Sequence, residues 1–371
     1  MPVKKLLFIF GTRPEAIKMA PLIKEAAGYP DKLSVSICIT GQHKEMLSQI
    51  MHFFQLQADY DLALMKPNQT LFDITAESIR KLEDVLEDNQ PDIILVQGDT
   101  TTAMTGALAG FYKKKSVAHI EAGLRSYNKY APFPEEVNRK IISTIADFHF
   151  APTEQCKINL AKENISDHVY VTGNTVIDAL LWGVEKVRKD PSCAKAFSFL
   201  DKQKKTILVT AHRRESFGEP FEHICEALLQ LANTFSETEI VYPVHLNPNV
   251  REVVYKKLGN HSSIHLIEPL DYPQLLWIMD RSYLVITDSG GIQEEAPSLG
   301  KPVLVLRNVT ERMEGVKAGN AILVGTSTEK IVAEASLLLS NTAAYKKMTN
   351  IINPYGTGDS ARKIISVLLN N

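Results

Sequence analysis

Three carboxylates in the first half of the chain stand where acid–base groups are expected. Asp99 follows the apolar run 92–97 after a single glycine, Glu121 directly follows the run 116–120, and Glu135 opens a helix behind two prolines. Ligands of open parallel sheets bind beyond the carboxyl ends of the strands, so these side chains are expected to converge there. Carboxylates in such a place can transfer protons or stabilise positive charge that develops in a transition state.

Each carboxylate also has a purely structural interpretation. Asp99 could cap the helix that follows it, and Glu121 could pair with Arg125. Glu135 lies four residues before Arg139, so the two share a helix face and could form an ordinary surface ion pair. The convergence of all three at strand ends favours the chemical interpretation.

Glycines and basic residues follow other predicted strands and could hold an anion. After the strand 6–10, a turn carrying Arg13 leads into a helix with Lys18, and a helix N-terminus attracts phosphate. The alternative is a strand-to-helix turn with a solvated arginine and lysine. The turn matches neither GxGxxG nor a P-loop, so it does not support NAD or ATP binding.

The second half of the chain has two comparable turns. His212 and Arg213 follow the strand 206–210 and form either an anion site or a solvated basic loop. After the strand 284–287, the sequence Asp-Ser-Gly-Gly opens a helix whose amides could cradle a diphosphate, and Glu295 could accept hydrogen bonds from a ribose. The alternative is a glycine-rich helix start capped by Asp288 or Ser289.

Short apolar runs alternate with amphipathic stretches along the whole chain, which predicts βαβ units and parallel sheets covered on both faces. We therefore expect two doubly wound domains, residues 1–173 and 174–354, with a final helix within 355–371 that packs back on the first. The predicted strands are 6–10, 34–39, 92–97, 116–120, 148–151, 169–171, 206–210, 239–243, 264–267, 284–287, 303–306 and 321–324. The stretch 188–205 is polar and lysine-rich and gives the weakest signal.

The composition narrows the class of protein. Of the 371 residues, 44% are hydrophobic and 23% charged, which argues against a disordered, collagen-like or membrane-embedded chain. The net charge of −2 offers no basic excess for a nucleic acid, and no run of about 18 apolar residues predicts a spanning helix. Four dispersed cysteines fit a reduced, cytoplasmic setting, and without HExxH or paired CxxC motifs we expect no metal.

Several segments match one known family in its order and cover nearly the whole chain. They are FGTRPEAIKMAPLI, GQHKEML, GDTTT, HIEAGLRS, PFPEEVNRK, FAPTE, VTGNTVIDAL, AHRRESFGE, HLNPNV and TDSGGIQEEAPSLGKPVLVLR. In these segments the chain resembles the bacterial non-hydrolysing UDP-N-acetylglucosamine 2-epimerases. The resemblance implies two Rossmann-like domains with a central cleft, the GT-B arrangement of many nucleotide-sugar glycosyltransferases, and a homodimer.

The family's reaction inverts C2 of UDP-N-acetylglucosamine (UDP-GlcNAc) to give UDP-N-acetylmannosamine (UDP-ManNAc). It proceeds by anti elimination of UDP to 2-acetamidoglucal and re-addition of UDP, without a cofactor, and a second UDP-GlcNAc activates many members. The product would feed capsule, teichoic-acid or other surface polysaccharide synthesis. The alternatives are a hydrolysing relative that releases N-acetylmannosamine, a GT-B glycosyltransferase, and a non-catalytic UDP-sugar sensor, which would not need the three carboxylates.

By position, the resemblance implies three sets of site residues. The catalytic set is Asp99, Glu121, Glu135 and His212; the substrate-binding set is Arg13, Lys18, Arg139, Leu275, Ser289, Gly290, Gly291, Glu295 and Arg312; the activator set is Gln42, His43, Gln69, Arg213 and His245. The chain departs from the family's usual pattern at Met313, at Leu270 and Leu275 near the expected uracil pocket, and at Asn68, where some activated members have arginine.

Overall fold

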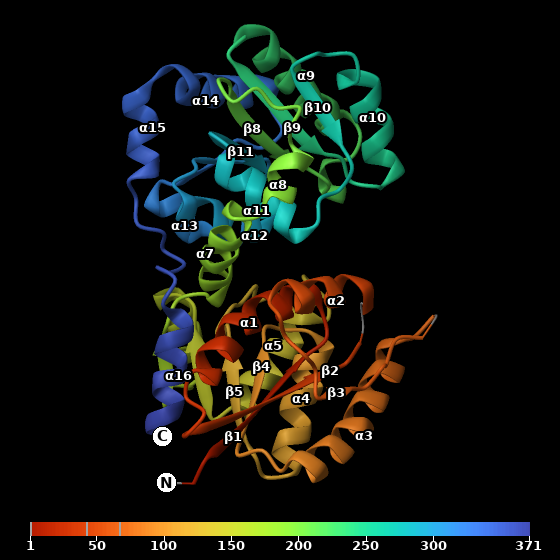
Figure 1. The fold of residues 1–371 in the computed structure, drawn as a ribbon, viewed down its shortest axis with the longest axis vertical. Coiled ribbons are helices and arrows are strands. Elements are labelled where there is room, and N and C mark those ends of the chain that lie inside the picture. Colours follow the sequence, from red (N-terminus) through yellow and green to blue (C-terminus); the bar gives the residue numbers. More distant parts are fainter. Residues whose placement is uncertain (1, 42–43, 67) are drawn as a thin grey trace. The chain divides into compact units, whose positions relative to one another are not determined.

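Two parallel β-sheets, each covered by helices, make up the two halves of the chain (Figure 1). The computed structural model describes residues 2–41, 44–66 and 68–371. The chain divides into a first unit, Met1–Ala179 with Gly356–Asn371, and a second unit, Leu180–Tyr355. The expected boundary at 173/174 precedes helix α7 (Thr175–Arg188), whereas the division falls inside that helix.

The first unit has a seven-stranded, all-parallel sheet in the order β3-β2-β1-β4-β5-β6-β7. Its strands are β1 (Lys4–Phe10), β2 (Leu33–Ile39), β3 (Tyr60–Asp61), β4 (Ile93–Gln97), β5 (Ser116–Ile120), β6 (Phe148–Ala151) and β7 (Val169–Val171). Its helices are α1 (Arg13–Ala27), α2 (Lys44–Phe53), α3 (Leu71–Asn89), α4 (Thr101–Tyr112), α5 (Glu135–Ile145), α6 (Glu154–Ala161), the start of α7, and α16 (Ser360–Asn370).

The second unit has a six-stranded parallel sheet in the order β10-β9-β8-β11-β12-β13. Its strands are β8 (Lys205–Thr210), β9 (Thr238–Pro243), β10 (Ile264–Ile267), β11 (Leu284–Thr287), β12 (Val303–Val305) and β13 (Ala321–Leu323). Its helices are α8 (Pro191–Ala196), α9 (Glu219–Thr234), α10 (Pro248–Leu258), α11 (Tyr272–Arg281), α12 (Gly290–Glu295), α13 (Met313–Ala318), α14 (Thr328–Ser340) and α15 (Thr342–Thr349), with the 3-10 turns η1 (Arg214–Ser216) and η2 (Ala296–Leu299).

The strand order reverses direction once in each sheet, between β1 and β4 in the first and between β8 and β11 in the second. Chain segments that leave neighbouring strands at such a switch point turn to opposite faces of the sheet and leave a crevice at its carboxyl edge. Four of the predicted ligand-binding turns, those after β1, β4, β8 and β11, lie at these two switch points. The expectation of two Rossmann-like α/β units is therefore confirmed.

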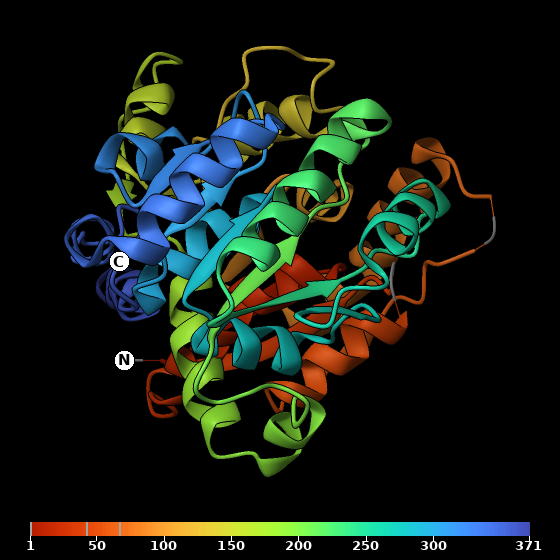
Figure 2. The same cartoon turned by 90° about the horizontal axis from the view of Figure 1, so that it is seen from above.

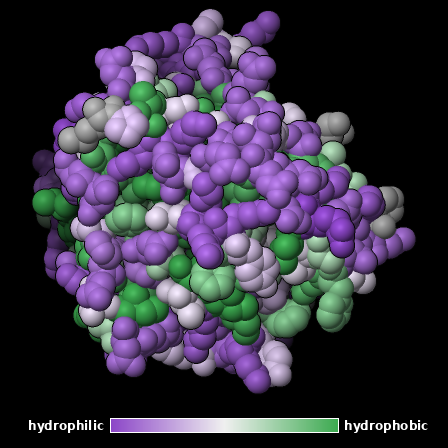
Figure 3. Space-filling view, turned by 90° about the horizontal axis from the view of Figure 1, so that it is seen from below, coloured by the Kyte–Doolittle hydropathy of each residue, from purple (hydrophilic) through white to green (hydrophobic). Residues whose placement is uncertain are grey.

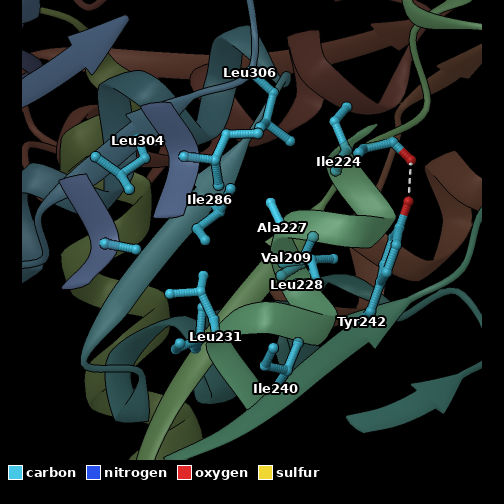
Figure 4. Packing of buried hydrophobic residues seen from close by; sticks show 14 of the residues in the cluster. Val209, Ile224, Ala227, Leu228, Leu231, Ile240, Tyr242, Ile286, Leu304 and Leu306 are labelled. Atoms are coloured by element: carbon cyan, nitrogen blue, oxygen red, sulfur yellow. Dashed lines mark hydrogen bonds between the residues drawn. The ribbon is translucent and has the colours of Figure 1, made fainter. Parts of the chain in front are cut away.

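Buried apolar side chains hold the sheet of the second unit against its helices. Val209, Ile240 and Ile286 are fully buried between the sheet and Leu228 of α9 (Figure 4). Figure 2 shows α9 and α14 side by side over this sheet, in agreement with their many contacts. Each such side chain contributes about 1.5–3 kcal/mol through removal of apolar surface from water. The hydroxyl of buried Tyr242 donates to the Ala211 carbonyl at 2.8 Å, so the core also fixes the backbone just before His212 (Figure 4).

The C-terminal helix α16 returns to the first unit and packs against α1 (Figure 1). Lys4 Nζ donates to the Leu368 carbonyl at 2.7 Å, and the Ala361 amide donates to the buried Asp178 carboxylate at 2.9 Å. Burial raises the pKa of Asp178 above its usual value. The last helix thus completes the first unit, although it follows the whole of the second in sequence.

Strand β3 and helix α8 are among the elements absent from the sequence prediction. Strand β3 has only two residues, and α8 lies within the polar stretch 188–205. Asp190 caps α8, because its side chain accepts a hydrogen bond from the Ser192 amide. Pro191 is the first residue of the helix. This helix is specified by capping chemistry rather than by an apolar face, so hydrophobic periodicity does not reveal it.

The surface carries few large apolar areas. On the face in Figure 3, hydrophilic side chains predominate and hydrophobic ones occur in smaller groups. In the ranges that the structure describes, no helix is both long and apolar enough to cross a membrane, and no cluster of three or more His, Cys, Asp or Glu side chains could hold a metal ion. All four cysteines are buried free thiols.

Two buried histidines predict how the stability of the first unit depends on pH. His119 of β5 and His149 of β6 are register partners, and burial lowers their pKa values to about 3 and about 4. The unfolded chain binds protons at these positions below about pH 6.5, whereas the folded unit does not, so stability is lost as pH falls from there towards 3. Each histidine should cost about 2 kcal/mol at pH 5, since one pH unit corresponds to about 1.4 kcal/mol.

Urea unfolding of the first unit at pH 7 and pH 5 measures this loss. His149→Gln should remove about half of the difference, because glutamine does not titrate. An unchanged pH dependence in the His149→Gln variant would contradict the assignment.

Candidate active site

Glu121 directly follows β5, and donors from three other segments surround its buried carboxylate. Lys18 Nζ of α1 lies 2.7 Å from both carboxylate oxygens. The Gln97 amide at the end of β4 donates to Oε2, and the Asn174 amide, just before α7, donates to Oε1 at 2.9 Å. The structural alternative, a pair with Arg125, is wrong, because Arg125 is buried and bonded to Glu163 at 2.6 Å.

The structure specifies the surroundings of the Lys18 ammonium more closely than the sequence did. The resemblance put Lys18 near the diphosphate, whereas its ammonium lies against Glu121. Arg13 lies partly buried in the first turn of α1, as expected for a residue at a helix N-terminus.

Asp99 follows β4 and pairs with an arginine from α5. Arg139 Nε and Nη2 lie 2.9 and 2.6 Å from the same Asp99 carboxylate oxygen. The alternative role of Asp99 as a helix cap is wrong, because the Thr100 side chain accepts the Ala103 amide and caps α4. Asp99 is therefore an ion-paired carboxylate at the carboxyl edge of the sheet.

Arg139 is itself held by the buried Glu136, at 2.9 Å, rather than by Glu135. Burial alone would raise the pKa of Glu136, but donation from the Ser126 and Tyr127 amides and from Arg139 brings that pKa below its usual value. The predicted Glu135–Arg139 ion pair is consequently wrong.

Glu135 has different surroundings from the other two carboxylates. Its Oε2 is buried and, within the described part of the chain, makes no hydrogen bond. Glu135 lines a cavity of about 500 Å³ together with Asp99 and Gln69. Binding pockets for small molecules are commonly of this size. The first unit therefore brings Asp99, Glu135 and one residue of the expected activator set, Gln69, to one cavity.

The Glu15 side chain accepts hydrogen bonds from both turns at the first switch point. Its buried carboxylate accepts the Gly11 and Thr12 amides at 3.1 and 2.8 Å and the Thr100 hydroxyl at 2.6 Å. Burial raises the pKa of Glu15. The turn after β1 and the turn that carries Asp99 are thus fixed to one side chain.

In the second unit, His212 follows β8 and lies beside Asp288, which follows β11. One Asp288 oxygen accepts the His212 and Arg213 amides at 2.6 and 2.8 Å, and the other lies 3.1 Å from His212 Nδ1. Burial alone would raise the pKa of Asp288, but His212 and these amides bring that pKa below its usual value. Asp288 therefore orients the His212 ring, and this contact leaves Nε2 as the ring nitrogen available to a ligand.

His245 stacks on His212 with ring centroids 5.3 Å apart and an interplanar angle of 15°. Burial and the neighbouring His212 lower the pKa of His245. Arg213 Nε donates to the Asp288 carbonyl at 2.9 Å. Arg213 and His245, both of the expected activator set, thus adjoin the expected catalytic histidine. Gln42 and His43 of that set lie outside the described residues.

The glycines after β11 lie beneath an arginine. A Cβ atom on buried Gly290 would lie 3.2 Å from Arg312 Cζ, and Arg312 Nε donates to the Glu294 carboxylate at 2.9 Å. Gly291 is exposed, and the nearest atom to a Cβ there would be Glu295 Oε2 at 4.0 Å. Amide and guanidinium donors thus lie together at the second switch point, as an anion site requires.

The remaining residues of the expected substrate-binding set are Ser289 and Leu275. Ser289 precedes α12 without a side-chain capping bond, so of the two caps considered Ser289 holds the position and Asp288 is engaged with His212. Leu275 lies partly buried in α11.

The sequence analysis did not assign site roles to Glu15, Gln97, Glu136 and Asn174. A polar residue at the end of an otherwise apolar strand signals Gln97, and the short VTGNT segment contains Asn174. The partners of all four come from distant segments, so their contacts depend on the folded sheet.

The chain matches known proteins over nearly its whole length. Residues 27–369 match the family model described as UDP-N-acetylglucosamine 2-epimerase. The chain is 50% identical over 372 residues to the UDP-N-acetylglucosamine 2-epimerase of Yersinia pestis, with 99% of each chain covered, and 49% identical to that of Escherichia coli K12, again with 99% of each covered. A crystal structure of the Neisseria meningitidis UDP-GlcNAc 2-epimerase bound to UDP-GlcNAc superimposes with a TM-score of 0.89 at 50% identity, covering 99% of this chain and 100% of that one.

The expected resemblance is therefore confirmed by the fold, by the arrangement of residues at the two switch points and by whole-length identity to several relatives: the chain belongs to the UDP-N-acetylglucosamine 2-epimerase family.

Proposed function

We propose that the chain interconverts UDP-GlcNAc and UDP-ManNAc by eliminating and re-adding UDP. The observation that carries this proposal is the presence of three carboxylates in two kinds of environment at one sheet edge. Asp99 and Glu121 are each paired with a cation, whereas Glu135, which lines the 500 Å³ cavity, has a buried oxygen with no hydrogen-bond partner among the described residues.

These environments match the chemical difficulty of the reaction. The C2 proton is not adjacent to a carbonyl and is barely acidic, so direct deprotonation is unfavourable. Elimination breaks the C1–oxygen bond and removes the C2 proton, and the electron pair of the C2–H bond forms the C1–C2 double bond of 2-acetamidoglucal. UDP leaves as an anion, and its re-addition with proton delivery to the other face of C2 gives the epimer.

Loss of UDP gives C1 oxocarbenium character, which nearby anions stabilise. Asp99 and Glu121, each paired with a cation, fit this task. Glu135, whose Oε2 lacks a hydrogen-bond donor, is the group available to accept the C2 proton.

The second unit supplies groups that fit the nucleotide. His212, Arg312 and the amides of Gly290 and Gly291 are suited to the diphosphate, whose charge increases as it leaves. Ser289 and Glu295 would contact the ribose, and Leu275 the uracil. The Neisseria relative is described as bound to UDP-GlcNAc, which supports this substrate class.

A reaction in D2O tests the proposal. Interconversion should place deuterium at C2 of both sugar nucleotides, and retention of protium at C2 would contradict elimination. Accumulation of free N-acetylmannosamine would indicate a hydrolysing enzyme, a glycosylated acceptor would indicate a transferase, and binding without turnover would indicate a sensor.

We extend the proposal to activation, assembly and cellular role. Within the first unit Gln69 lines the cavity of Asp99 and Glu135, and within the second His245 stacks on His212, which supports activation by a second UDP-GlcNAc at residues that adjoin the expected catalytic groups of each unit. Phe111 and Tyr112 at the end of α4 are exposed aromatic residues that suit the interface of a homodimer. Sedimentation of such a dimer should give about twice the chain mass of 41.4 kDa. Four free thiols fit a cytoplasmic enzyme that supplies surface polysaccharide synthesis.

Gly290→Ala should weaken UDP binding about tenfold or more, a change of about 1.4 kcal/mol. The new methyl group would approach Arg312 Cζ to 3.2 Å and displace the guanidinium from the diphosphate site. Calorimetric titration with UDP measures the change. Because the effect acts through Arg312, Gly290→Ala should add little to an Arg312→Ala variant, and additive losses would contradict this route.

A further inference from the structure

We infer that Gln97 and Asn174 are positioning residues that keep Glu121 ionised and oriented for the proposed reaction. The inference rests on the proposed function, since it concerns how one of its carboxylates is held. Neither amide is placed on the substrate here; both act through Glu121.

The two amides contact Glu121 from segments that end or follow strands on opposite sides of β5 in the sheet. Gln97 ends β4 and donates to Oε2, and Asn174 follows β7 and donates to Oε1 at 2.9 Å. Both amides are nearly inaccessible, with 2% and 3% of their surface exposed. Lys18 contacts both oxygens at 2.7 Å, so each oxygen receives an ammonium and an amide proton.

The orientation of the Asn174 amide is fixed by a second hydrogen bond. Its Oδ1 accepts the Val176 amide at 3.0 Å, at the start of α7, so its Nδ2 must be the atom that faces Glu121. A carboxylate that only accepts hydrogen bonds matches such donors, whereas a protonated carboxyl group would oppose one of them. The donors therefore favour the ionised form of Glu121.

The backbone of Glu121 shows why such support is required. Glu121 is a non-glycine residue with φ of +67°, a left-handed conformation that is costly for residues with a side chain. Glu121 adopts this conformation directly after β5, where its side chain meets Lys18 of α1, Gln97 at the end of β4 and Asn174 before α7. Contacts to the side chain thus compensate for an unfavourable backbone conformation.

Asn174→Asp tests the inference with almost no change in shape. It keeps the acceptor for the Val176 amide and replaces only the donor to Glu121. At about pH 8, two carboxylates would face each other, and we expect kcat to fall about tenfold or more while KM for UDP-GlcNAc changes less than about threefold. As pH is lowered to about 6, the pair takes up one proton, the protonated carboxyl becomes a donor again, and kcat should recover relative to wild type.

Gln97→Glu makes the same change from a different strand and should give the same pH-dependent loss, so the test survives if one variant does not fold. Asn89→Asp is the matched control, because Asn89 ends α3 and donates to Ser36 without contacting Glu121. It should retain wild-type kcat and pH dependence.

Two results overturn the inference. A wild-type-like pH profile in folded Asn174→Asp and Gln97→Glu variants would show that neither amide controls Glu121. A loss of kcat that does not vary with pH would indicate a merely structural role. Absence of epimerisation by the wild-type enzyme would instead contradict the proposed function itself, and the two failures are thereby distinguished.

Discussion

Glu121→Gln should lower kcat at least about a hundredfold while leaving UDP affinity close to wild type. Glutamine keeps the size of the side chain but removes the negative charge that would face the developing oxocarbenium ion. The groups that suit UDP belong to the second unit, whereas Glu121 belongs to the first. Rates of interconversion followed by NMR and calorimetric titration with UDP separate the two effects.

Asp99→Asn and Glu135→Gln should have losses of similar size, and Glu135→Gln should also slow deuterium entry at C2 in step with interconversion. Glu185→Gln is a suitable control, because this exposed carboxylate of α7 pairs only with Lys189 on the surface. Near-normal kcat in all three carboxylate variants would refute their catalytic roles.

Lys18→Met should both inactivate the enzyme and destabilise the first unit by about 2 kcal/mol. The substitution removes the ammonium that contacts both oxygens of the Glu121 carboxylate, while the neutral amides of Gln97 and Asn174 stay bonded to the buried charge. Because Lys18 retains some exposure, the expected loss is below that of a fully buried pair. Urea unfolding and kcat together measure the two consequences.

The double variant Lys18→Met with Glu121→Gln separates stability from chemistry. Removing the second charge eliminates the uncompensated carboxylate, so most of the lost free energy of unfolding should return. Activity should not return, because the catalytic carboxylate is then absent. A double variant as unstable as the sum of both single variants would contradict the direct ion pair.

The alternation of apolar strands and amphipathic helices was sufficient to predict the fold. The strands β5, β6, β7, β10 and β11 have the predicted bounds, because each is a short, largely apolar run followed by a polar residue or proline. Helix α8 was missed because its polar sequence has no periodic apolar face, and β3 because two residues carry too little pattern. These failures occur where capping and edge pairing, rather than burial, define the element.

The sequence predicted the positions of the three carboxylates along the chain but not the residues with which they form ion pairs. The sequence placed Asp99, Glu121 and Glu135 at strand ends, yet each proposed ion-pair or capping alternative for them proved wrong. Arg139 lies one turn from Glu135 in sequence, but the order of strands brings it to Asp99, and Lys18 reaches Glu121 from 103 residues away. Nearest charges along the chain are therefore a poor guide to nearest charges in space.

The amino-acid sequence by itself determined which segments become strands and helices, which family the chain belongs to and which residues end each strand, because these properties depend on local composition and short motifs. Only the tertiary structure decided which carboxylate meets which cation, and that one Glu135 oxygen has no hydrogen-bond partner in the described ranges. The partners in each ion pair come from separate βαβ units. The order of the strands in the sheet determines whether two charged groups come within the few ångströms at which they interact strongly.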